Sequence, residues 1–346
     1  MSKLLPTCLA AGLILLAPEI AEAQSAGDFY RGKTLTVMIG SGAGGGIDQV
    51  ARAVVRHLGK HVPGNPTVVP KNMGGAGGLQ MLNYIYAVAP KDGATIGVVL
   101  PSLVFDPLFA GKTATEVFDP LKMRWLGGPA RYASVAVAWN PVTTVRKAED
   151  LLTQELVVGS AAAASNSATD GYVMRNLLGF RYRVVTGYPS GADIDLAMIR
   201  GETQGRANIA WYGIKTRNSE WLRDGKISVL YQMGLKKHPD IPPDVPLILD
   251  LVRTPVERQV LELKFSAYDV GYAFMAPPET PAERVAALRA AFAATFNDPV
   301  YRAEAARERL EVDPVTGYEV DAIIRNSYAG SPDLIARLVE AIKPPK

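Results

Sequence analysis

The sequence has almost no cysteine, since Cys8 is the one cysteine in 346 residues. Cys8 lies in a segment typical of a signal peptide, in which Lys3 precedes an apolar stretch at residues 9–17 and residues 21–23 form an A-x-A cleavage pattern. Cleavage there would leave residues 24–346 without cysteine, which excludes disulfides, thiolate nucleophiles and zinc–sulfur sites from the mature chain. We therefore expect its stability to come from burial of apolar side chains.

The apolar stretch of this leader has about half of the ~20 residues that a membrane-spanning helix needs. Residues 1–23 are therefore interpreted as a cleaved signal peptide, and the mature chain is predicted to be periplasmic. Cys8 precedes the apolar stretch instead of ending it, which argues against a lipid-modified terminus. No twin-arginine pair precedes the stretch, so we expect export of an unfolded chain without a bound cofactor.

The chain also lacks a basic run with interleaved aromatic residues, which excludes a nucleic-acid footprint. Its formal charge of +3 rises by one when Lys3, Glu19 and Glu22 leave with the leader, and a small positive surplus suits an anionic ligand. No Gly-Lys-Ser/Thr follows the glycine-rich turns described next, so a nucleotide P-loop is not predicted. No G-x-S-x-G pattern surrounds the serines at residues 160–167, so a nucleophile elbow is not predicted either.

Glycine, by contrast, is concentrated in two short turns at residues 40–48 and 74–78. Each turn lies between an apolar, strand-like run and a helix-like run. Glycine allows a positive φ and a close approach of the backbone to a ligand, while the first N–H groups of the following helix carry partial positive charge. Such turns hold a carboxylate or phosphate without lysine or arginine, so we predict a receptor for small anions.

The first third of the mature chain alternates strand and helix patterns. Strands are predicted at residues 35–39, 67–69 and 95–100, with helices between them at residues 47–59 and 79–89. Short connections in this order predict a mostly parallel sheet covered on both faces. Ligands bind beyond the carboxyl ends of the strands in such sheets, and both glycine turns fall there.

A second series of strands follows residues 118–120 and predicts a second lobe. Within it, a turn of small residues at 160–167 precedes a predicted helix at residues 168–178, which resembles the arrangement of the glycine turns. Strands are predicted at residues 134–139, 156–159, 182–185, 207–210 and 227–231.

The C-terminal part is predicted to cross back and pack on the first lobe. After a short strand at residues 272–275, residues 280–283 form a capping-box pattern with proline at the first helical position. Two crossings between two lobes make a hinge, and the cleft between lobes is a favoured site for small ligands. The first helix carries Val285, Leu288, Phe292 and Phe296 on one face, and further helices are predicted from Val300, Tyr318 and Pro332.

Gly40, Gly42 and Gly45 also match the dinucleotide-binding pattern G-x-G-x-x-G. The acid expected at the end of the next strand is missing, and Lys71 and Asn72 stand near that place. An NADP-linked enzyme therefore stays open as an alternative, as does an exported carboxylate-acting hydrolase. Export through the general pathway counts against a nicotinamide cofactor, so we expect no cofactor and no catalytic residue.

The histidines give no clear metal signal. His57 and His61 are spaced for two ligands on one helix face, but no third ligand follows nearby, and we interpret them as a solvated helix end. His238 stands in a predicted loop with no nucleophile to pair with. We therefore expect no metal site.

Two acids and an aromatic residue are candidates for ligand contact in the second lobe. Asp193 and Asp195 lie in the first turn of a predicted helix, where acids favour the helix dipole, and Asp193 is the better candidate. Trp211 follows a strand, a position that suits either the core or a cleft wall.

Residues 39–48, followed by Ala51 and Arg52, resemble the first binding loop of the solute receptors of tripartite tricarboxylate transporters, the Bug or TctC-like family. The resemblance extends in the family's order over nearly the whole mature chain. The further matching segments are Asn72 and residues 75–78, 89–93, 159–167, 188–191, 272–277 and 280–281.

The resemblance implies an α/β fold of the type II periplasmic binding protein class, with two hinged lobes that each hold a mostly parallel sheet flanked by helices. It implies lobes formed by residues 27–130 with 266–346 and by residues 131–265. It also implies a monomeric, non-enzymatic receptor that captures a small organic acid and delivers it to the membrane subunits of a tripartite tricarboxylate transporter. The acid is a di- or tricarboxylate or an aromatic acid, and a sensory ligand-binding subunit stays open as an alternative.

In such receptors the two glycine loops hold a ligand carboxylate through backbone N–H groups and ordered waters. The prolines that the family often has near Gly40 and Gly42 are missing, and Met73 and Gly74 stand where it often has Arg-Pro, so looser or more closely approaching loops are expected. The predicted ligand-binding residues are Ser41, Gly42, Ala43, Gly44, Gly45, Asp48, Gly75, Ala76, Gly77, Ser102, Ser160, Ser165, Asn166, Ser167, Ser190, Gly191, Asp193 and Trp211.

Overall fold

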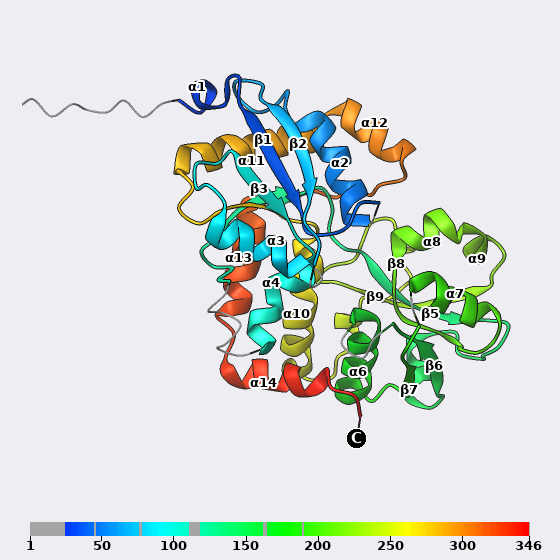
Figure 1. The fold of residues 1–346 in the computed structure, drawn as a ribbon. Helices are drawn as coiled ribbons and strands as arrows, with labels where there is room; N and C mark the ends of the chain where they lie inside the picture. Colours follow the sequence, from blue (N-terminus) through cyan, green and yellow to red (C-terminus); the bar gives the residue numbers. More distant parts are fainter. Residues whose placement is uncertain are drawn as a thin grey trace, which may run out of the picture.

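Two β-sheets, each flanked by helices, form the two lobes of an α/β fold, as the sequence predicts (Figure 1). The computed structural model describes residues 25–345 apart from 45, 76–77, 111–117, 162–164 and 189. The predicted signal peptide lies outside the described residues. None of the described helices is both long and apolar enough to span a membrane.

The first sheet contains β1 (Thr34–Ile39), β2 (Thr67–Asn72), β3 (Thr95–Val98), β4 (Arg124–Gly128), β10 (Phe274–Ala276) and β11 (Val315–Thr316). Its strand order is β11-β4-β10-β3-β1-β2. β1 pairs in parallel with both neighbours, so that Thr36 faces Val69 on one side and Thr95 on the other. The carboxyl ends of these three strands therefore share one edge of the sheet.

Apolar side chains of the first sheet point alternately to its two faces along each strand. Helices therefore cover both faces. Along β1, Val37 and Ile39 enter one core, whereas Met38 enters the core on the opposite face. The first face is covered by α1 (Ala26–Tyr30), α2 (Gly46–Leu58), α11 (Ala282–Asn297) and α12 (Pro299–Arg307). The second face is covered by α3 (Leu79–Asn83), its π-helical continuation η2 (Tyr84–Val88), α4 (Pro101–Ala110) and α13 (Gly317–Tyr328).

The second sheet contains β5 (Ser134–Trp139), β6 (Leu156–Gly159), β7 (Tyr182–Val185), β8 (Gly205–Ala210) and β9 (Ile227–Met233). In the order β7-β6-β8-β5-β9, β6, β7 and β8 are parallel, and β5 runs antiparallel to both of its neighbours. The predicted bounds of β5, β6 and β7 are confirmed. The helical segments of this lobe are η3 (Ala148–Leu152), α6 (Asn166–Leu178), α7 (Gly191–Ile199), α8 (Trp211–Arg217), α9 (Ser219–Arg223) and η4 (Ile248–Asp250).

Two helices, α10 (Pro255–Val270) and α14 (Pro332–Ala341), connect the lobes. On α10, Phe265 belongs to the core of the second sheet, whereas Val270 belongs to the core beneath the first. α14 packs against α10, α4 and α6, and the Asn176 Nδ2 of α6 donates to the Ala341 carbonyl oxygen at 2.9 Å. Figure 1 shows α14, in red, running from beneath the first lobe to α6 in the second.

The chain crosses between the two sheets at residues 129–133 and 271–273, and the two crossing segments touch. The Tyr132 amide donates to the Tyr268 carbonyl oxygen at 2.8 Å. Gly271 has a φ of +59°, and a Cβ at this position would collide with the Ala130 carbonyl oxygen. Glycine is therefore needed for the two segments to lie side by side, which is the arrangement of a hinge.

α11 and α12 pack against α2 and α13 packs against β4, so these three helices pack on the first lobe as predicted, whereas α14 contributes Leu338 to the core of the second sheet. The predicted apolar face of α11 is confirmed, because its four predicted side chains are all buried. The predicted capping box is wrong. Thr280 Oγ1 donates to the Pro277 carbonyl oxygen at 2.9 Å, and Pro281 occupies the cap position, so that α11 begins at Ala282 without a side-chain cap.

Candidate functional site

The two glycine turns meet at the carboxyl edge of the first sheet. The Asn72 side chain, at the end of β2, donates to the Ser41 carbonyl oxygen at 3.1 Å. Gly78 has a φ of +105°, and a Cβ there would lie 2.6 Å from the Gly40 carbonyl oxygen. The absence of a side chain therefore allows the second turn to pack directly on the first.

Asp48, the third residue of α2, organises the first turn. Its carboxylate is buried and accepts hydrogen bonds from the Gly44 amide at 2.8 Å, Arg52 Nε at 2.9 Å and Asn72 Nδ2 at 2.8 Å. Burial alone would raise the pKa of this carboxyl, but the hydrogen bonds from Arg52, Gly44 and Asn72 outweigh it and lower the pKa. The ionised carboxylate thereby fixes the turn around Gly44, which has a φ of +82°.

Two amides of the first turn remain available to a ligand. The Ser41 amide donates to the Ile39 carbonyl oxygen at 2.8 Å, and the Gly44 amide donates to Asp48. Within the described part of the chain, the amides of Gly42 and Ala43 have no protein acceptor, and both residues are exposed. The turn thus presents two adjacent backbone donors to solvent.

The rest of the predicted first-lobe site is partly described. Gly75 is exposed with a φ of +106° and accepts a hydrogen bond from the Gly78 amide at 2.9 Å. Ser102 is the second residue of α4, just beyond β3, so its backbone lies near the same carboxyl edge. Gly45, Ala76 and Gly77 lie outside the described residues.

In the second lobe, the predicted small-residue turn follows the carboxyl end of β6. The hydroxyls of Ser160, Ser165 and Ser167 form a triangle with Oγ–Oγ distances of 3.0, 2.7 and 2.9 Å. Ser165 caps α6, and Asn166 is the first residue of that helix. Hydroxyl contacts thus link the three serines of this turn, whereas the first turn is braced by the Asp48 carboxylate and the Asn72 side-chain amide.

A second predicted segment of this lobe caps α7. Ser190 Oγ accepts from the Asp193 amide at 3.3 Å and donates to the Asp193 carboxylate at 2.6 Å. The Gly191 carbonyl oxygen accepts from Arg206, whose guanidinium also pairs with the buried Asp195 carboxylate at 2.6 Å. Asp195 is thus part of a buried ion pair, and Asp193 is part of a helix cap.

α6 is tied to α10 through a buried carboxylate that the sequence analysis did not identify. Asp170 Oδ1 pairs with Lys264 Nζ at 2.9 Å, and its other oxygen accepts from Asn208 Nδ2 at 2.6 Å and from the Tyr268 hydroxyl. Burial is the main reason that the pKa of Tyr268 is raised well above its usual value, so this phenol stays protonated. The helix behind the serine turn is therefore anchored to the helix that connects the lobes.

Between the lobes, a cavity of about 340 Å³ lies where the chain crosses from one sheet to the other. Gly44 contributes from the first glycine turn, and Tyr212 and Gly213 contribute from the start of α8 in the second lobe. Its size suits a small organic molecule. The other lining residues are Gln49, Val50, Ala130, Arg131, Tyr132, Ala133, Ala210, Arg217, Tyr272, Leu310 and Glu311.

The charged residues that line this cavity are Arg131, Arg217 and Glu311. Arg131 is held by Asp313 at 3.1 Å and Glu319 at 3.2 Å, while its buried Nε has no hydrogen-bond partner among the described residues. Arg217 forms no ion pair with a described residue. Burial raises the pKa of Tyr132 and of Tyr272, so both phenols are neutral hydrogen-bonding groups.

Of the predicted site residues that the structure describes, Gly44 is the one that lines this cavity, and the described residues of the serine turn do not line it. Trp211 is buried in the core of the second sheet with Ile214 and Trp221, and the next residue, Tyr212, reaches the cavity instead. Sequence reasoning missed Arg131, since the segment that carries it has no motif. Tyr212 could have been found from the sequence, because it closely follows the end of β8.

The prediction of a solvated helix end for the two paired histidines is wrong, because α12 covers them. His57 is buried with its Nε2 at 2.7 Å from Glu304 Oε2, and His61 Nε2 lies 3.0 Å from Asp298 Oδ2. Each imidazole therefore has its own carboxylate partner. Both contacts fasten α12 to α2, a tertiary packing that spacing along one helix does not reveal.

Comparison with known proteins was made at the level of sequence and of fold. No model of a known protein family matches the chain. The chain is 27% identical over 301 residues to the UPF0065 protein in the TAR-I ttuE-ttuC' intergenic region of Agrobacterium vitis, which covers 82% of this chain and 77% of that protein.

Among solved structures, a TctC solute binding protein from Polaromonas superposes with a TM-score of 0.67 at 16% identity, over 90% of this chain and 99% of its own. The periplasmic binding protein BugD gives a TM-score of 0.59 at 18% identity, over 90% and 98%. MatC from Rhodopseudomonas palustris, solved with bound malate, gives 0.57 at 20% identity, over 90% and 99%. These similarities confirm the resemblance of the chain to the TctC- and Bug-like solute-binding proteins and its two-lobed periplasmic binding protein fold.

Proposed function

We propose that this protein is a periplasmic receptor that captures a small organic carboxylate between its lobes and delivers it, as a monomer and without chemical change, to the membrane subunits of a tripartite tricarboxylate transporter. The observation that carries the proposal is the glycine turn braced by Asp48 at the edge of the interlobe cavity. This turn offers the Gly42 and Ala43 amides at the start of α2, where the helix dipole favours an anion.

The two lobes form different walls of the cavity, and we assign each wall a different part of the ligand. The first lobe holds the carboxylate that all ligands share, through the amides of its glycine turns and bridging water. The second lobe and the crossing segments contact the remainder of the ligand, through groups such as Tyr212 and Arg217. The predicted contacts at the serine turn and the α7 cap stay part of the proposal as groups that approach the ligand when the lobes close.

Closure gives the binding its strength in this proposal. It removes water from the carboxylate, so that the backbone dipoles act at low effective dielectric. The ligand stabilises the closed arrangement because it contacts both lobes only there. The lobe boundaries of the proposal remain residues 27–130 with 266–346 and residues 131–265, and α10 lies across the second boundary.

The substrate class is a small organic acid. The malate-bound MatC structure supports a dicarboxylate, since that protein shares the fold of this chain. Arg217, which pairs with no acid among the described residues, would give a second carboxylate a cationic partner in the cavity. A thermal-shift screen of mono-, di- and tricarboxylates and aromatic acids identifies the ligand, because a ligand at a hundred times its dissociation constant adds about 2.7 kcal/mol of stability.

The test of the site compares two glycines with the same strain. Gly44 (φ +82°) and Gly225 (φ +62°) both have open space where a Cβ would stand, so valine is equally unfavourable in backbone terms at either position. Gly44→Val should lower the affinity for the acid found in the screen by more than about tenfold, since it displaces the turn. Gly225→Val, remote from the cavity, should leave the affinity unchanged. Equal affinities of the two variants in calorimetry would show that the glycine turn does not bind the ligand.

A further inference from the structure

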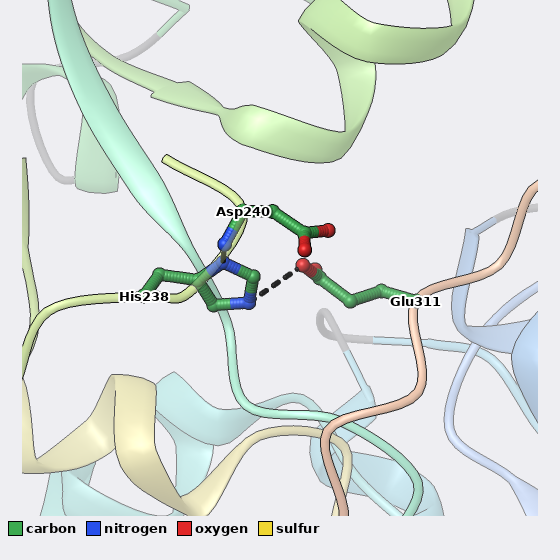
Figure 2. Close-up of side chains that lie close together, drawn as sticks. All are labelled: His238, Asp240 and Glu311. Carbon is green, nitrogen blue, oxygen red and sulfur yellow. Dashed lines mark hydrogen bonds and ion pairs between the residues drawn. The ribbon is translucent and has the colours of Figure 1, made fainter. Parts of the chain in front are cut away.

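A histidine and two carboxylates meet beside the interlobe cavity, and one of the three, Glu311, also lines that cavity (Figure 2). His238 and Asp240 lie in the segment after β9 of the second sheet, and Glu311 lies in the segment between α12 and β11. All three line a second cavity of about 470 Å³, which shares Tyr212, Leu310 and Glu311 with the interlobe cavity. The cluster therefore joins chain segments from the two lobes.

The side chains of the histidine and the glutamate are largely shielded from solvent, and their facing atoms are incompletely paired. The His238 and Glu311 side chains are 10% and 13% exposed, and Nε2 lies 2.8 Å from Oε1. Despite this distance, the two atoms are not aligned as a hydrogen bond, and neither has another hydrogen-bond partner in the described part of the chain. Figure 2 shows the Asp240 carboxylate pointing toward the same space from above the imidazole. One ligand atom from each residue lies within 4.8 Å of the others.

We propose that His238, Asp240 and Glu311 bind a divalent transition-metal ion, with Zn²⁺ as the best match, at the junction of the two lobes. An imidazole nitrogen with two carboxylate oxygens is a donor set that Zn²⁺ accepts, with water in a fourth position. Tetrahedral ligands at ~2.0–2.2 Å from the metal stand about 3.3–3.6 Å apart. Rotation of the exposed Asp240 side chain and a slight separation of the other two residues reach this geometry.

Two contacts compete with the metal. The Lys215 ammonium lies 2.5 Å from the Asp240 carboxylate, and the Asp240 amide donates to His238 Nδ1 at 3.2 Å. The amide contact leaves the ring proton of a neutral imidazole on Nε2, so metal binding at Nε2 moves that proton to Nδ1 and turns the amide away. Both competing contacts involve exposed Asp240 and are weak.

The other charged groups around the cluster do not neutralise the negative charge of its carboxylates. Arg309 donates to the Thr216 carbonyl oxygen at 3.0 Å, and Asp313 pairs with Arg131. Neither of the other two histidines has a comparable pair of carboxylates, because His57 and His61 each face one acid that also pairs with a basic side chain. No sequence pattern indicates the cluster, since Glu311 is far from His238 along the chain.

A metal ion bound here would hold the segment after β9 against the segment between α12 and β11. Its ligands come from segments that belong to different sheets, so the ion binds tightly only while those segments are close. If the lobes also close on an organic acid, each ligand should strengthen the binding of the other by the same factor. The metal site itself does not depend on that proposal, because the ion can be titrated without any acid.

The experiment is a calorimetric titration of ZnCl₂ into the mature chain without a histidine tag, after treatment with a chelator, in a non-coordinating buffer at pH 7. We expect one ion per chain and a raised melting temperature, with no comparable effect of MgCl₂. Glu311→Gln and His238→Asn should each lower the Zn²⁺ affinity at least about tenfold. The matched control His61→Asn removes an imidazole beside a single acid and should bind Zn²⁺ like the parent.

Lys215→Gln distinguishes loss of a metal ligand from loss of folding, because an unfolded variant would not bind Zn²⁺ more tightly. This variant should raise the Zn²⁺ affinity about twofold to fivefold, since it removes the competing ammonium. Circular dichroism without metal checks that each variant is folded. The proposal is overturned if Zn²⁺ does not bind, if Mg²⁺ binds as well as Zn²⁺, or if folded Glu311→Gln binds Zn²⁺ as tightly as the parent. Binding of the organic acid by these variants is measured separately, so failure here leaves the proposed function untouched.

Discussion

The two lobes each hold a buried aspartate near the start of the helix that follows their small-residue turn, but they use it differently. In the first lobe, Asp48 receives the Gly44 amide and the side chains of Arg52 and Asn72, which come from the first turn, α2 and the end of β2. In the second lobe, Asp170 is held by side chains from β8 and α10. The first turn is therefore shaped locally, whereas the second is supported from the helix that connects the lobes.

In the proposed function, this difference would assign recognition of the shared carboxylate to the first lobe and recognition of the rest of the ligand to the second. A turn braced within itself keeps the same backbone donors whatever the position of the other lobe, which suits a carboxylate common to all ligands. A turn held by the serine hydroxyls on a helix fastened to α10 follows the movement of the hinge. We expect the first lobe to determine whether an acid binds and the second to determine which acid binds.

The largest effect is expected from Lys264→Met, which leaves the Asp170 carboxylate buried without its cation. Removing one partner of a buried ion pair costs about 3–5 kcal/mol of the free energy of unfolding. Urea denaturation measures the loss. The double variant Lys264→Met/Asp170→Asn should recover part of it, and a single-variant loss below about 1 kcal/mol would mean that α6 does not depend on α10.

Asp48→Asn should have a smaller effect on stability and a larger one on binding. It replaces charged hydrogen bonds by neutral ones, which costs about 2 kcal/mol of the free energy of unfolding. Because the turn loses its brace, the affinity for the organic acid should fall by more than about tenfold. Calorimetry and urea denaturation check the two effects together, and a stable variant with parental affinity would contradict the bracing role.

The contribution of Asp48 should also depend on pH in a defined direction. Its pKa is lowered in the folded protein, so the stability that it contributes is present above the unfolded pKa of about 3.9 and is lost as pH falls through the folded value. The difference in the free energy of unfolding between the parent and Asp48→Asn should therefore be constant from pH 7 to pH 5 and shrink below pH 4. If the difference in the free energy of unfolding persisted below pH 4, the effect of Asp48→Asn would come from the shape of the side chain and not from its charge.

The smallest effect is expected from Ser165→Ala in the second lobe. Loss of one hydroxyl from the serine triangle should cost about 1 kcal/mol of stability. Affinities should change by different factors for different acids, so that their order is altered while binding is retained. Equal changes for every acid would remove the distinction between the two lobes.

The sequence predicts the alternating strands and helices well, because short apolar runs that stop at glycine or small residues leave few alternatives. It also predicts that both glycine turns share an edge of one sheet. It does not predict Arg131, Tyr132 and Tyr272 as cavity residues, because the crossing segments that carry them follow no periodicity. The predicted ligand contacts of the serine turn and of Gly42 remain predictions until a ligand is observed.

The errors have a common physical origin. The capping box at residues 280–283 matches a local pattern, but Thr280 bonds backward to Pro277 because Pro281 fixes the chain in an extended conformation. His57 and His61 were expected to be solvated, but α12 packs over them. In each case a contact with a distant or preceding segment decides the outcome.

In the proposed function, α14 would limit how far the two lobes can open. It follows α13, which packs on β4 of the first sheet, yet its own side chain Leu338 lies in the core of the second, and its end is bonded to Asn176 of α6. A pure rotation about the two crossing segments would separate α14 from α6 or from α13 and expose its apolar face to water. This exposure costs ~25 cal/mol of free energy for each Å² of apolar surface. The easier route is for α14 to slide over α6, so the angle of opening is restricted by the distance that Leu338 can travel before it leaves apolar surroundings.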